Sequence, residues 1–144
     1  PVAKEGELFI LDWTGRKVSH HVVPVPGDGN IVSIEVASDG LVYGLSGNST
    51  LFVFDPVRRA VVHSERVSQY GGVPRHALHA GPDGYVYALM GNAVVRVKLG
   101  TFEHEKLTDV LAGARISAGG ALHKGVLYYA SGTHFWSYDV PGLE

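Results

Sequence analysis

Cysteine is absent from this chain of 144 residues, which excludes disulfide bonds and cysteine-ligated metal centres. An excess of positive charge is absent too, because 12 Lys and Arg residues face 14 Asp and Glu residues and leave a net charge of −2. Without a basic field to attract a phosphate backbone, we expect no nucleic-acid partner. No apolar run approaches the roughly 18 residues of a membrane-spanning helix, so we also expect no membrane span.

Catalytic motifs are equally scarce. The sequence contains no nucleophile elbow, no HExxH zinc motif and no glycine-rich phosphate loop set between a strand and a helix. Asp12, Asp55 and Asp139 recur at one place in the chain, but their setting is that of turn residues rather than of an acid–base pair. The sequence therefore assigns no catalytic residue, no metal ligand and no cofactor.

Glycine, by contrast, is abundant. The 19 glycines fall between apolar runs instead of gathering in one linker, a distribution typical of many short strands separated by turns. No stretch has a clear 3.6-residue periodicity, so we expect almost no helix. The chain has the length of one ordinary domain.

A unit of about 43 residues recurs along the chain. Asp39-Gly40 returns as Asp83-Gly84 and, in altered form, as Lys124-Gly125, at intervals of 44 and 41 residues. An alternating apolar run follows each pair, with a tyrosine at the same place in every run. These tyrosines are Tyr43, Tyr87 and Tyr128. A second marker, the residue that ends a later apolar run, recurs at intervals of 43, 43 and 41 residues. Its four positions are Asp12, Asp55, Lys98 and Asp139.

This period predicts an all-β chain of four-stranded antiparallel units, whose strands are called a to d in chain order. Two of the first strands are expected at 75–80 and 115–122. Each Asp-Gly pair suits a two-residue type I′ turn between strands a and b, with positive φ at both central residues. The units are a half unit at 7–25, complete units at 31–67 and 75–110, and an incomplete unit at 115–139.

The repeat resembles the blades of secreted bacterial β-propeller proteins, in the neighbourhood of the kelch, quinoprotein and lyase propellers. The resemblance is carried by "DGLVYGLSGNSTLFVFDP" and "GPDGYVYALMGNAVVRVKL" and covers almost the whole chain. It implies a β-propeller fragment of about three four-stranded blades, forming one partial domain over 1–144.

A propeller ring needs at least four blades, so we expect the remaining blades, or a second copy, as a partner. The chain starts at Pro1 without Met and ends in Leu-Glu, a pair typical of a tag junction. We therefore expect a piece excised from a longer protein.

The longer loops are expected to carry any binding site. In a four-stranded meander, the a–b and c–d turns lie on one face, and the b–c turns and the d–a connections lie on the other. Loops held on a rigid scaffold are the usual place for binding residues. Residues at the start of strand a would face both these loops and the central channel. The candidate ligand-binding residues are Tyr70, Arg75, His76 and Arg115.

Several of these polar residues also have a structural interpretation. Arg75 and Arg115 begin equivalent strands and could tie neighbouring blades together through carbonyl groups. His76 and His79 lie three apart on an expected strand, so they face opposite sides and cannot share one metal ion unaided.

Other residues are expected to be structural because they recur with the repeat. Three histidines follow the period on an expected exposed edge strand, where we predict no function. They are His20, His63 and His104. Trp136 aligns with Phe9 and Phe52, so we predict that it lies in the core between blades.

Three functional hypotheses remain. The first is a non-catalytic binding module of a larger, exported bacterial protein, which presents its loop face to a glycan or a protein. The alternative is part of a propeller polysaccharide lyase acting on uronate-containing glycans, with His76 as base, Tyr70 as acid and Arg75 neutralising the carboxylate. An intracellular scaffold is a third possibility. We expect an extracellular or periplasmic location, with the cytoplasm left open.

Overall fold

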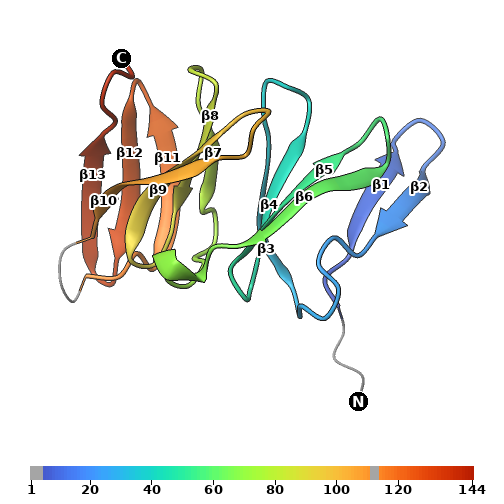
Figure 1. Cartoon of the computed structure of the whole chain (residues 1–144), viewed down its shortest axis with the longest axis horizontal. Helices are drawn as coiled ribbons and strands as arrows, with labels where there is room; N and C mark the ends of the chain where they lie inside the picture. Colours follow the sequence, from blue (N-terminus) through green and yellow to red (C-terminus); the bar gives the residue numbers. More distant parts are fainter. Residues whose placement is uncertain (1–4, 111–113) are drawn as a thin grey trace.

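The computed structural model of the chain describes residues 5–110 and 114–144, which form four antiparallel sheets placed one after another (Figure 1). Sheet 1 contains β1 (Leu8–Asp12) and β2 (Lys17–Val22). Sheet 2 contains β3 (Ile31–Val36), β4 (Val42–Ser46), β5 (Thr50–Asp55) and β6 (Ala60–Arg66). Sheet 3 contains β7 (Leu78–Ala80), β8 (Tyr85–Leu89), β9 (Ala93–Lys98) and β10 (His104–Asp109). Sheet 4 contains β11 (Ala118–His123), β12 (Val126–Ser131) and β13 (His134–Asp139).

Every sheet is a simple meander, in which each strand pairs with the next strand along the chain. The helical content of the described residues is one 3₁₀ turn, η1 (Ser68–Tyr70). The predicted all-β fold of consecutive four-stranded antiparallel units is confirmed.

The first strands of sheets 2, 3 and 4 lie side by side, so these three sheets radiate from a common inner edge. β7 contacts both β3 and β11. Between sheets 2 and 3, side chains of β3 accept hydrogen bonds from the backbone of β7: Ser33 from Leu78 and Glu35 from Ala80, both at 3.2 Å. Backbone groups therefore reach partners in the neighbouring sheet, which joins the sheets into one arc.

The alternation of side chains along each strand builds an apolar core between sheets 2 and 3. Tyr43, Leu51 and Val53 from sheet 2 and Val86 and Val95 from sheet 3 belong to this cluster, and all are buried. A second cluster fills the space between sheets 3 and 4. It includes Tyr87, Leu89, Val94, Ile116 and Leu127.

Large and small residues complement each other within a sheet. Gly44 pairs with Phe52 across β4 and β5, and a Cβ atom on Gly44 would lie only 2.1 Å from the Phe52 ring. The ring therefore covers the glycine, an arrangement that shields exposed backbone with aromatic surface. In sheet 3 the equivalent pair is Ala88 and Val95. There the methyl group of Ala88 replaces the glycine, and the facing side chain, Val95, is smaller than phenylalanine.

The predicted type I′ turns are wrong at both Asp-Gly pairs. Within each pair only the glycine has positive φ, at 79° for Gly40 and 85° for Gly84. In the first turn, the N–H of Gly40 donates to Ala37 at 3.0 Å, and the N–H of Ala37 donates to Leu41 at 3.1 Å. These bonds define a three-residue loop with its glycine as a bulge.

The reason for the longer loop is the aspartate. The Asp39 carboxylate accepts hydrogen bonds from the N–H of Leu41 at 3.0 Å and from the hydroxyl of Tyr43 at 2.9 Å. By contrast, Lys124 and Gly125 have φ values of 46° and 77°, so the altered pair is the one with positive φ at both residues.

Two first strands begin later than predicted. β7 starts at Leu78 rather than at residue 75, because Pro74 has no N–H to donate and His76 has a left-handed φ of 56°. β11 starts at Ala118 rather than at residue 115. The sequence predicts His76 and His79 on one strand, and this prediction is wrong, because only His79 lies on β7.

The repeated tyrosine–aspartate hydrogen bond should stabilise sheets 2 and 3 but not sheet 4. Tyr87 donates its hydroxyl to Asp83, and burial raises the pKa of Tyr87, which keeps that proton in place. We expect Tyr87→Phe to cost about 1–2 kcal/mol of unfolding free energy, because Asp83 loses a partly buried donor. Tyr128→Phe is the control with no such aspartate, and it should change stability by less than about 0.5 kcal/mol in urea unfolding. Equal costs would contradict a stabilising role for the pair.

Candidate functional site

The b–c turn of sheet 3 organises the face that carries the longer loops, which we call the loop face. Asn92 donates its N–H to Tyr70 at 3.0 Å, and Gly91 donates to Gly72 at 2.8 Å. Gly91 in turn accepts a hydrogen bond from Ile116 at 3.0 Å. Connections on both sides of sheet 3 are thus tied to one turn. In Figure 1 this face lies at the bottom, and the tight a–b and c–d turns lie at the top.

A groove of about 1320 Å³ opens between sheets 3 and 4 at this face. Arg115 is exposed on its wall, and the half-buried Trp136 stands beside His134, with 6.4 Å between their ring centroids. The groove thus combines a guanidinium group, aromatic rings and hydroxyl groups. Its lining residues are Asn92, Asp109, Val110, Ala114, Arg115, Ser117, Ser131, Gly132, Thr133, His134 and Trp136.

The residue that directly precedes β11, Ser117, is anchored beside this groove. Ser117 donates its N–H to the Ala130 carbonyl at 2.9 Å and accepts a hydrogen bond from the N–H of Gly132 at 3.0 Å. Arg115 lies two residues before this anchor. None of the ion pairs among the described residues involves Arg115, so its charge is available to an anion.

Arg75 and His76 lie at the seam between sheets 3 and 4. The carbonyl of Arg75 accepts a hydrogen bond from Gly119 at 2.9 Å, and Arg75 forms an isolated parallel bridge with Ala118. A Cβ atom on Gly119 would lie 1.9 Å from the carbonyl oxygen of His76, so only glycine allows this approach. Arg75 and His76 are both exposed, while their backbone is fixed against the neighbouring sheet.

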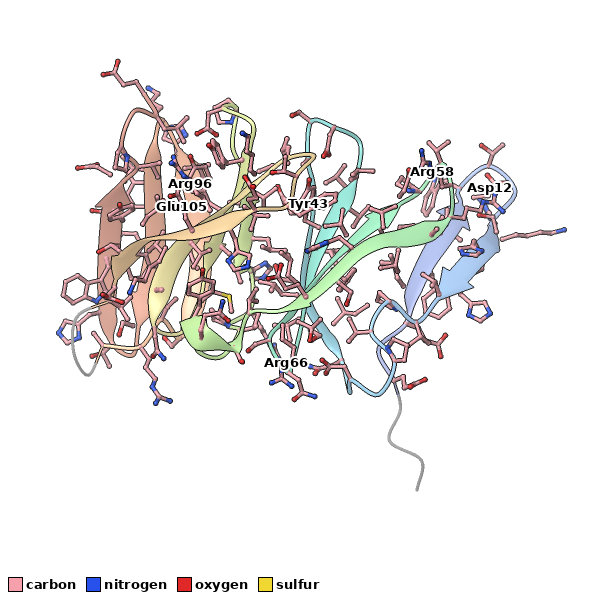
Figure 2. All side chains as sticks on the ribbon, viewed as in Figure 1. Asp12, Tyr43, Arg58, Arg66, Arg96 and Glu105 are labelled. Carbon is pink, nitrogen blue, oxygen red and sulfur yellow. The ribbon has the colours of Figure 1, made fainter. Side chains whose placement is uncertain are left out.

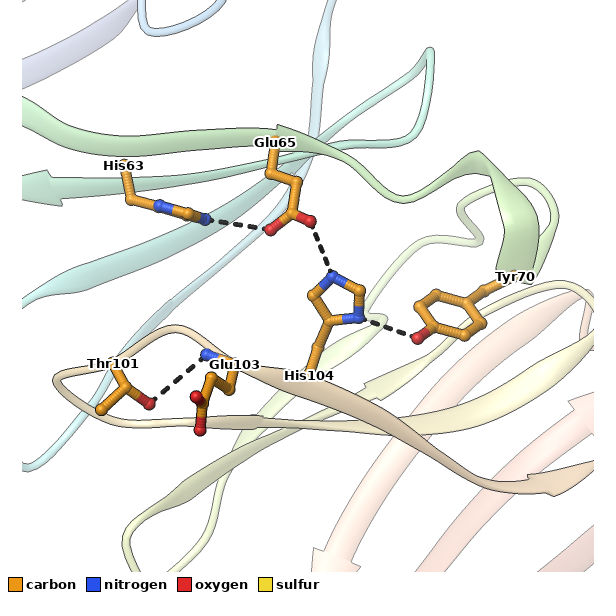
Figure 3. A network of polar contacts seen from close by, with 6 residues as sticks. All are labelled: His63, Glu65, Tyr70, Thr101, Glu103 and His104. Atoms are coloured by element: carbon orange, nitrogen blue, oxygen red, sulfur yellow. Dashed lines mark hydrogen bonds and ion pairs between the residues drawn. The ribbon is translucent and has the colours of Figure 1, made fainter.

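Tyr70 is directed elsewhere. Its carbonyl belongs to the loop face, but its hydroxyl lies 2.8 Å from Nδ1 of His104, between sheets 2 and 3 (Figure 3). The structure therefore places Arg75, His76 and Arg115 along one seam and puts the Tyr70 side chain at another. A ligand-binding role for these four residues stays a prediction.

A polar network joins sheets 2 and 3 at their outer strands (Figure 3). Glu65 on β6 accepts hydrogen bonds from Nε2 of His104 at 3.0 Å and from Nε2 of His63 at 3.2 Å. The His63 ring also stacks on Phe102, with 4.9 Å between centroids. The prediction of exposed histidines is therefore wrong for His63 and His104, because both rings turn into the interface between the sheets.

The third histidine of the series is also covered. His20 on β2 stacks on Phe54 of sheet 2, with 6.4 Å between ring centroids. Its Nε2 atom is buried and has no hydrogen-bond partner in the part of the chain that the structure describes. The period in the sequence thus marks a position between sheets rather than an exposed edge.

The Glu65 network should make stability depend on pH. The hydrogen bond from His104 is the main cause that lowers the pKa of Glu65 in the folded protein. Because the pKa of Glu65 is lower in the folded than in the unfolded protein, ionised Glu65 adds to the free energy of unfolding at pH values above its unfolded pKa of about 4.3. This contribution is lost as the pH falls through the folded pKa. We therefore expect Glu65→Gln to cost about 1 kcal/mol at pH 7 and nearly nothing at acid pH.

Thermal unfolding from pH 7 down to pH 3 measures this dependence. Asp109→Asn is the matched control, because Asp109 forms an exposed ion pair with Lys106 at 2.8 Å. We expect the control to change the unfolding free energy by less than about 0.5 kcal/mol throughout. A Glu65→Gln cost that is the same at pH 7 and pH 3 would rule out the charged carboxylate as its origin.

The sequence reasoning did not identify Trp136 and His134 as site residues. Trp136 pairs with Tyr129, which packs in the cluster between sheets 3 and 4, so its predicted place between blades is correct, but its side chain is half-buried and also lines the groove. The feature of the sequence that could have indicated this site is the serine–glycine–threonine turn at 131–133, directly before the strand that carries both residues. Within residues 5–110 and 114–144, no group of three or more His, Asp or Glu side chains could hold a metal ion. No helix in this part of the chain is long and apolar enough to cross a membrane.

Comparisons with known proteins identify the fold and no family. No family model matches this chain, and no curated protein matches its sequence. The extracellular domain of BT4673, a one component system of B. thetaiotaomicron, is similar with a TM-score of 0.72 and 13% identity, over 98% of this chain and 21% of that chain. The WD40 repeats of RRP9 are similar with a TM-score of 0.69 and 11% identity, over 98% and 44%.

A third similar structure is a catalytically inactive virginiamycin B lyase from Staphylococcus aureus, solved with quinupristin. Its TM-score is 0.61 at 11% identity, over 92% of this chain and 48% of that chain. At such identities the likeness shows the fold alone. The chain is an arc of β-propeller blades, and it spans between 21% and 48% of these three solved chains.

Proposed function

We propose that this chain is a non-catalytic binding module of a larger, exported bacterial protein. It forms one partial propeller domain over 1–144 and presents its loop face to a glycan. The observation that carries the proposal is the groove between sheets 3 and 4. It brings together aromatic rings, hydroxyl groups and the guanidinium group of Arg115, which forms no ion pair with residues 5–110 or 114–144. Export is supported by the likeness to an extracellular propeller domain from a bacterium.

Arg115 favours an acidic sugar over a neutral one, and the one carboxylate among the described lining residues, Asp109, is paired with Lys106 at 2.8 Å. Arg115 offers planar, charged donors that match a carboxylate, and Ser117 and Thr133 offer hydroxyl groups for ring oxygens. Trp136 supplies apolar surface for a sugar ring. Arg75 and His76 extend the same seam inward and could contact the next sugar unit.

The geometry supports binding more strongly than lyase chemistry. The lyase hypothesis needs Tyr70 and His76 at a single substrate, as acid and base. The Tyr70 hydroxyl is instead engaged with His104 in the interface between sheets 2 and 3. We therefore favour the binding module.

A uronate oligosaccharide titrated against the wild type, Arg115→Ala and Arg75→Ala tests this function. We expect each substitution to weaken binding by about ten- to a hundred-fold, which corresponds to the loss of one charge-assisted contact of about 1.5–3 kcal/mol. A neutral oligosaccharide of the same length should bind more weakly to the wild type.

Arg58→Ala is the matched control, since Arg58 pairs with Asp55 at 3.7 Å in the β5–β6 turn, on the opposite face (Figure 2). It should leave affinity unchanged. If Arg115→Ala and Arg75→Ala keep the fold and both bind as tightly as the wild type, the groove is not the site.

A further inference from the structure

The loop face carries a second groove, beside sheet 2. It has a volume of about 430 Å³, and its walls are the connection between sheets 1 and 2 and the loop-face end of sheet 2. We call the groove between sheets 3 and 4 the first groove and this one the second groove. The polar residues that line the second groove include Asp28, Asn48, Thr50, Ser64 and Arg66.

Arg66 supplies the exposed positive charge of the second groove. Thr50 on β5 is its cross-strand partner, and the N–H of Val67 donates to the carbonyl of Ser49 at 2.8 Å, which holds this end of β6 against the b–c turn of sheet 2. Figure 2 shows Arg66 at the loop face, where it is exposed. None of the ion pairs among the described residues involves Arg66, so its charge can meet an anion.

The second groove also contains an acceptor that lacks a donor. Asp28 is only 6% exposed, and its Oδ1 atom has no hydrogen-bond partner within residues 5–110 and 114–144. Leaving a buried acceptor without a donor is costly, and a hydroxyl group of a ligand would supply that donor. Glu65 lines the groove too, but its carboxylate is already held by His104 and His63. A ligand with both a carboxylate and hydroxyl groups therefore suits this lining.

The two grooves offer matching chemistry. Asn48 and Asn92 lie 44 residues apart, the interval that also separates the two Asp-Gly pairs, and each asparagine stands in the b–c turn of its sheet. Each groove joins this asparagine to hydroxyl groups and to one guanidinium group, which matches a carboxylate in geometry and charge. The guanidinium groups are those of Arg115 in the first groove and Arg66 in the second.

One segment fixes the spacing between the grooves. The connection between sheets 2 and 3 is tied to the b–c turn of sheet 2, because Ser49 donates its hydroxyl to the carbonyl of Gly71 at 2.9 Å. The next residue of this connection, Gly72, accepts the N–H of Gly91 in the b–c turn of sheet 3 at 2.8 Å. Since these two turns carry Asn48 and Asn92, the grooves are held in a fixed relation, which favours a ligand that reaches both.

We propose that the second groove is a further subsite for the same acidic glycan, so that one polyuronate chain occupies both grooves at once. Arg66 binds the carboxylate of one uronate unit, and Asp28 and Asn48 contact its hydroxyl groups. This inference rests on the proposed function and narrows its ligand to a polymer that spans sheets 2 to 4 of the loop face.

Calorimetric titration with uronate oligosaccharides of increasing length tests the proposal. A disaccharide should bind mainly in the first groove, where Trp136 adds a stacking surface. A long oligomer should bind the wild type at least about tenfold more tightly, because its second contact is intramolecular. Arg66→Ala should abolish this gain and leave disaccharide affinity unchanged, whereas Arg115→Ala should weaken disaccharide binding. Amide shifts at Asn48 and Arg66 should appear with the long oligomer.

Arg58→Ala is the control, because it removes the same charge from the same sheet on the opposite face (Figure 2). It should keep the full gain with length. Asn48→Ala should reduce the gain as well, and it replaces Arg66→Ala if that variant loses its fold, as judged by its amide spectrum.

Three results would overturn the proposal. The first is a wild type that binds the long oligomer no more tightly than the disaccharide, or an Arg66→Ala variant that keeps the gain. The proposed function then still stands, provided that Arg115→Ala weakens disaccharide binding. The second is an equal loss of the gain in Arg58→Ala, which would reveal unspecific attraction to a polyanion. The third is a wild type that binds no uronate of any length, which contradicts the proposed function itself.

Discussion

Phe52→Ala is expected to destabilise the protein by about 3–5 kcal/mol, the largest effect of any single substitution considered for this chain. Phe52 is fully buried on β5, and its ring covers Gly44 on β4. Truncation therefore removes apolar contacts, leaves a cavity and uncovers the glycine backbone at once. Because sheet 1 packs on the same side of sheet 2, we expect contacts between these two sheets to loosen as well.

Urea unfolding followed by fluorescence measures this cost. Phe135→Ala is the matched control, since it is the same substitution on the equivalent strand of sheet 4, at an exposed side chain. At concentrations where the chain is monomeric, it should cost less than about 1 kcal/mol. Similar costs at the two positions would mean that the interface between sheets 1 and 2 does not form as described.

Gly119→Ala should open the seam between sheets 3 and 4. The added methyl group would meet the carbonyl oxygen of His76 at 1.9 Å, a backbone atom that cannot rotate away. We expect a loss of at least about 1–3 kcal/mol, the range for overpacking at sites that must shift to adapt. The shift also moves Arg75 away from β11, so uronate affinity should fall together with stability.

Gly72→Ala is the control for this prediction. A Cβ atom on Gly72 would have no neighbour within 4 Å, and its φ is not positive. Its stability should change by less than about 0.5 kcal/mol. Hydrogen exchange locates the effect: faster exchange at the amides of Gly119 and Ile116 in Gly119→Ala would support the seam, and unchanged exchange there would contradict it.

The fold could be predicted because its signals are local and repeated. Alternation with period two defines each strand, and two independent markers share one spacing along the chain. The turn geometry could not be predicted as well, because Asp39 bonds both to Leu41 and to the Tyr43 hydroxyl, and the resulting loop is one residue longer. The turn preferences of an Asp-Gly dipeptide do not predict a contact with a side chain four residues away.

Burial was harder to predict than strand position. Phe9, Phe52 and Trp136 occupy one place in the repeat, yet they are exposed, buried and half-buried, respectively. Burial depends on whether a neighbouring sheet is present and on how closely it packs, and a pattern within one unit specifies neither. The orientation of His104 likewise depends on Glu65 from the preceding sheet.

The candidate site was predicted only in part for the same reason. The choice of the loop face followed from meander topology, and it led to Arg75, His76 and Arg115 near one seam. The groove with Trp136 and His134 also depends on the placement of residues 114–117 before β11, which no local pattern specifies. The direction of the Tyr70 side chain depends on its contact with His104.

Amide shift mapping of the wild type with a uronate oligosaccharide tests most directly the claim that the loop face binds a ligand. We predict that shifts cluster at Asn92, at Arg115 and Ser117, and at Gly132 to His134, around the groove between sheets 3 and 4. Shifts that cluster instead at the Asp39-Gly40 and Asp83-Gly84 turns, or no shifts at millimolar ligand, would contradict it.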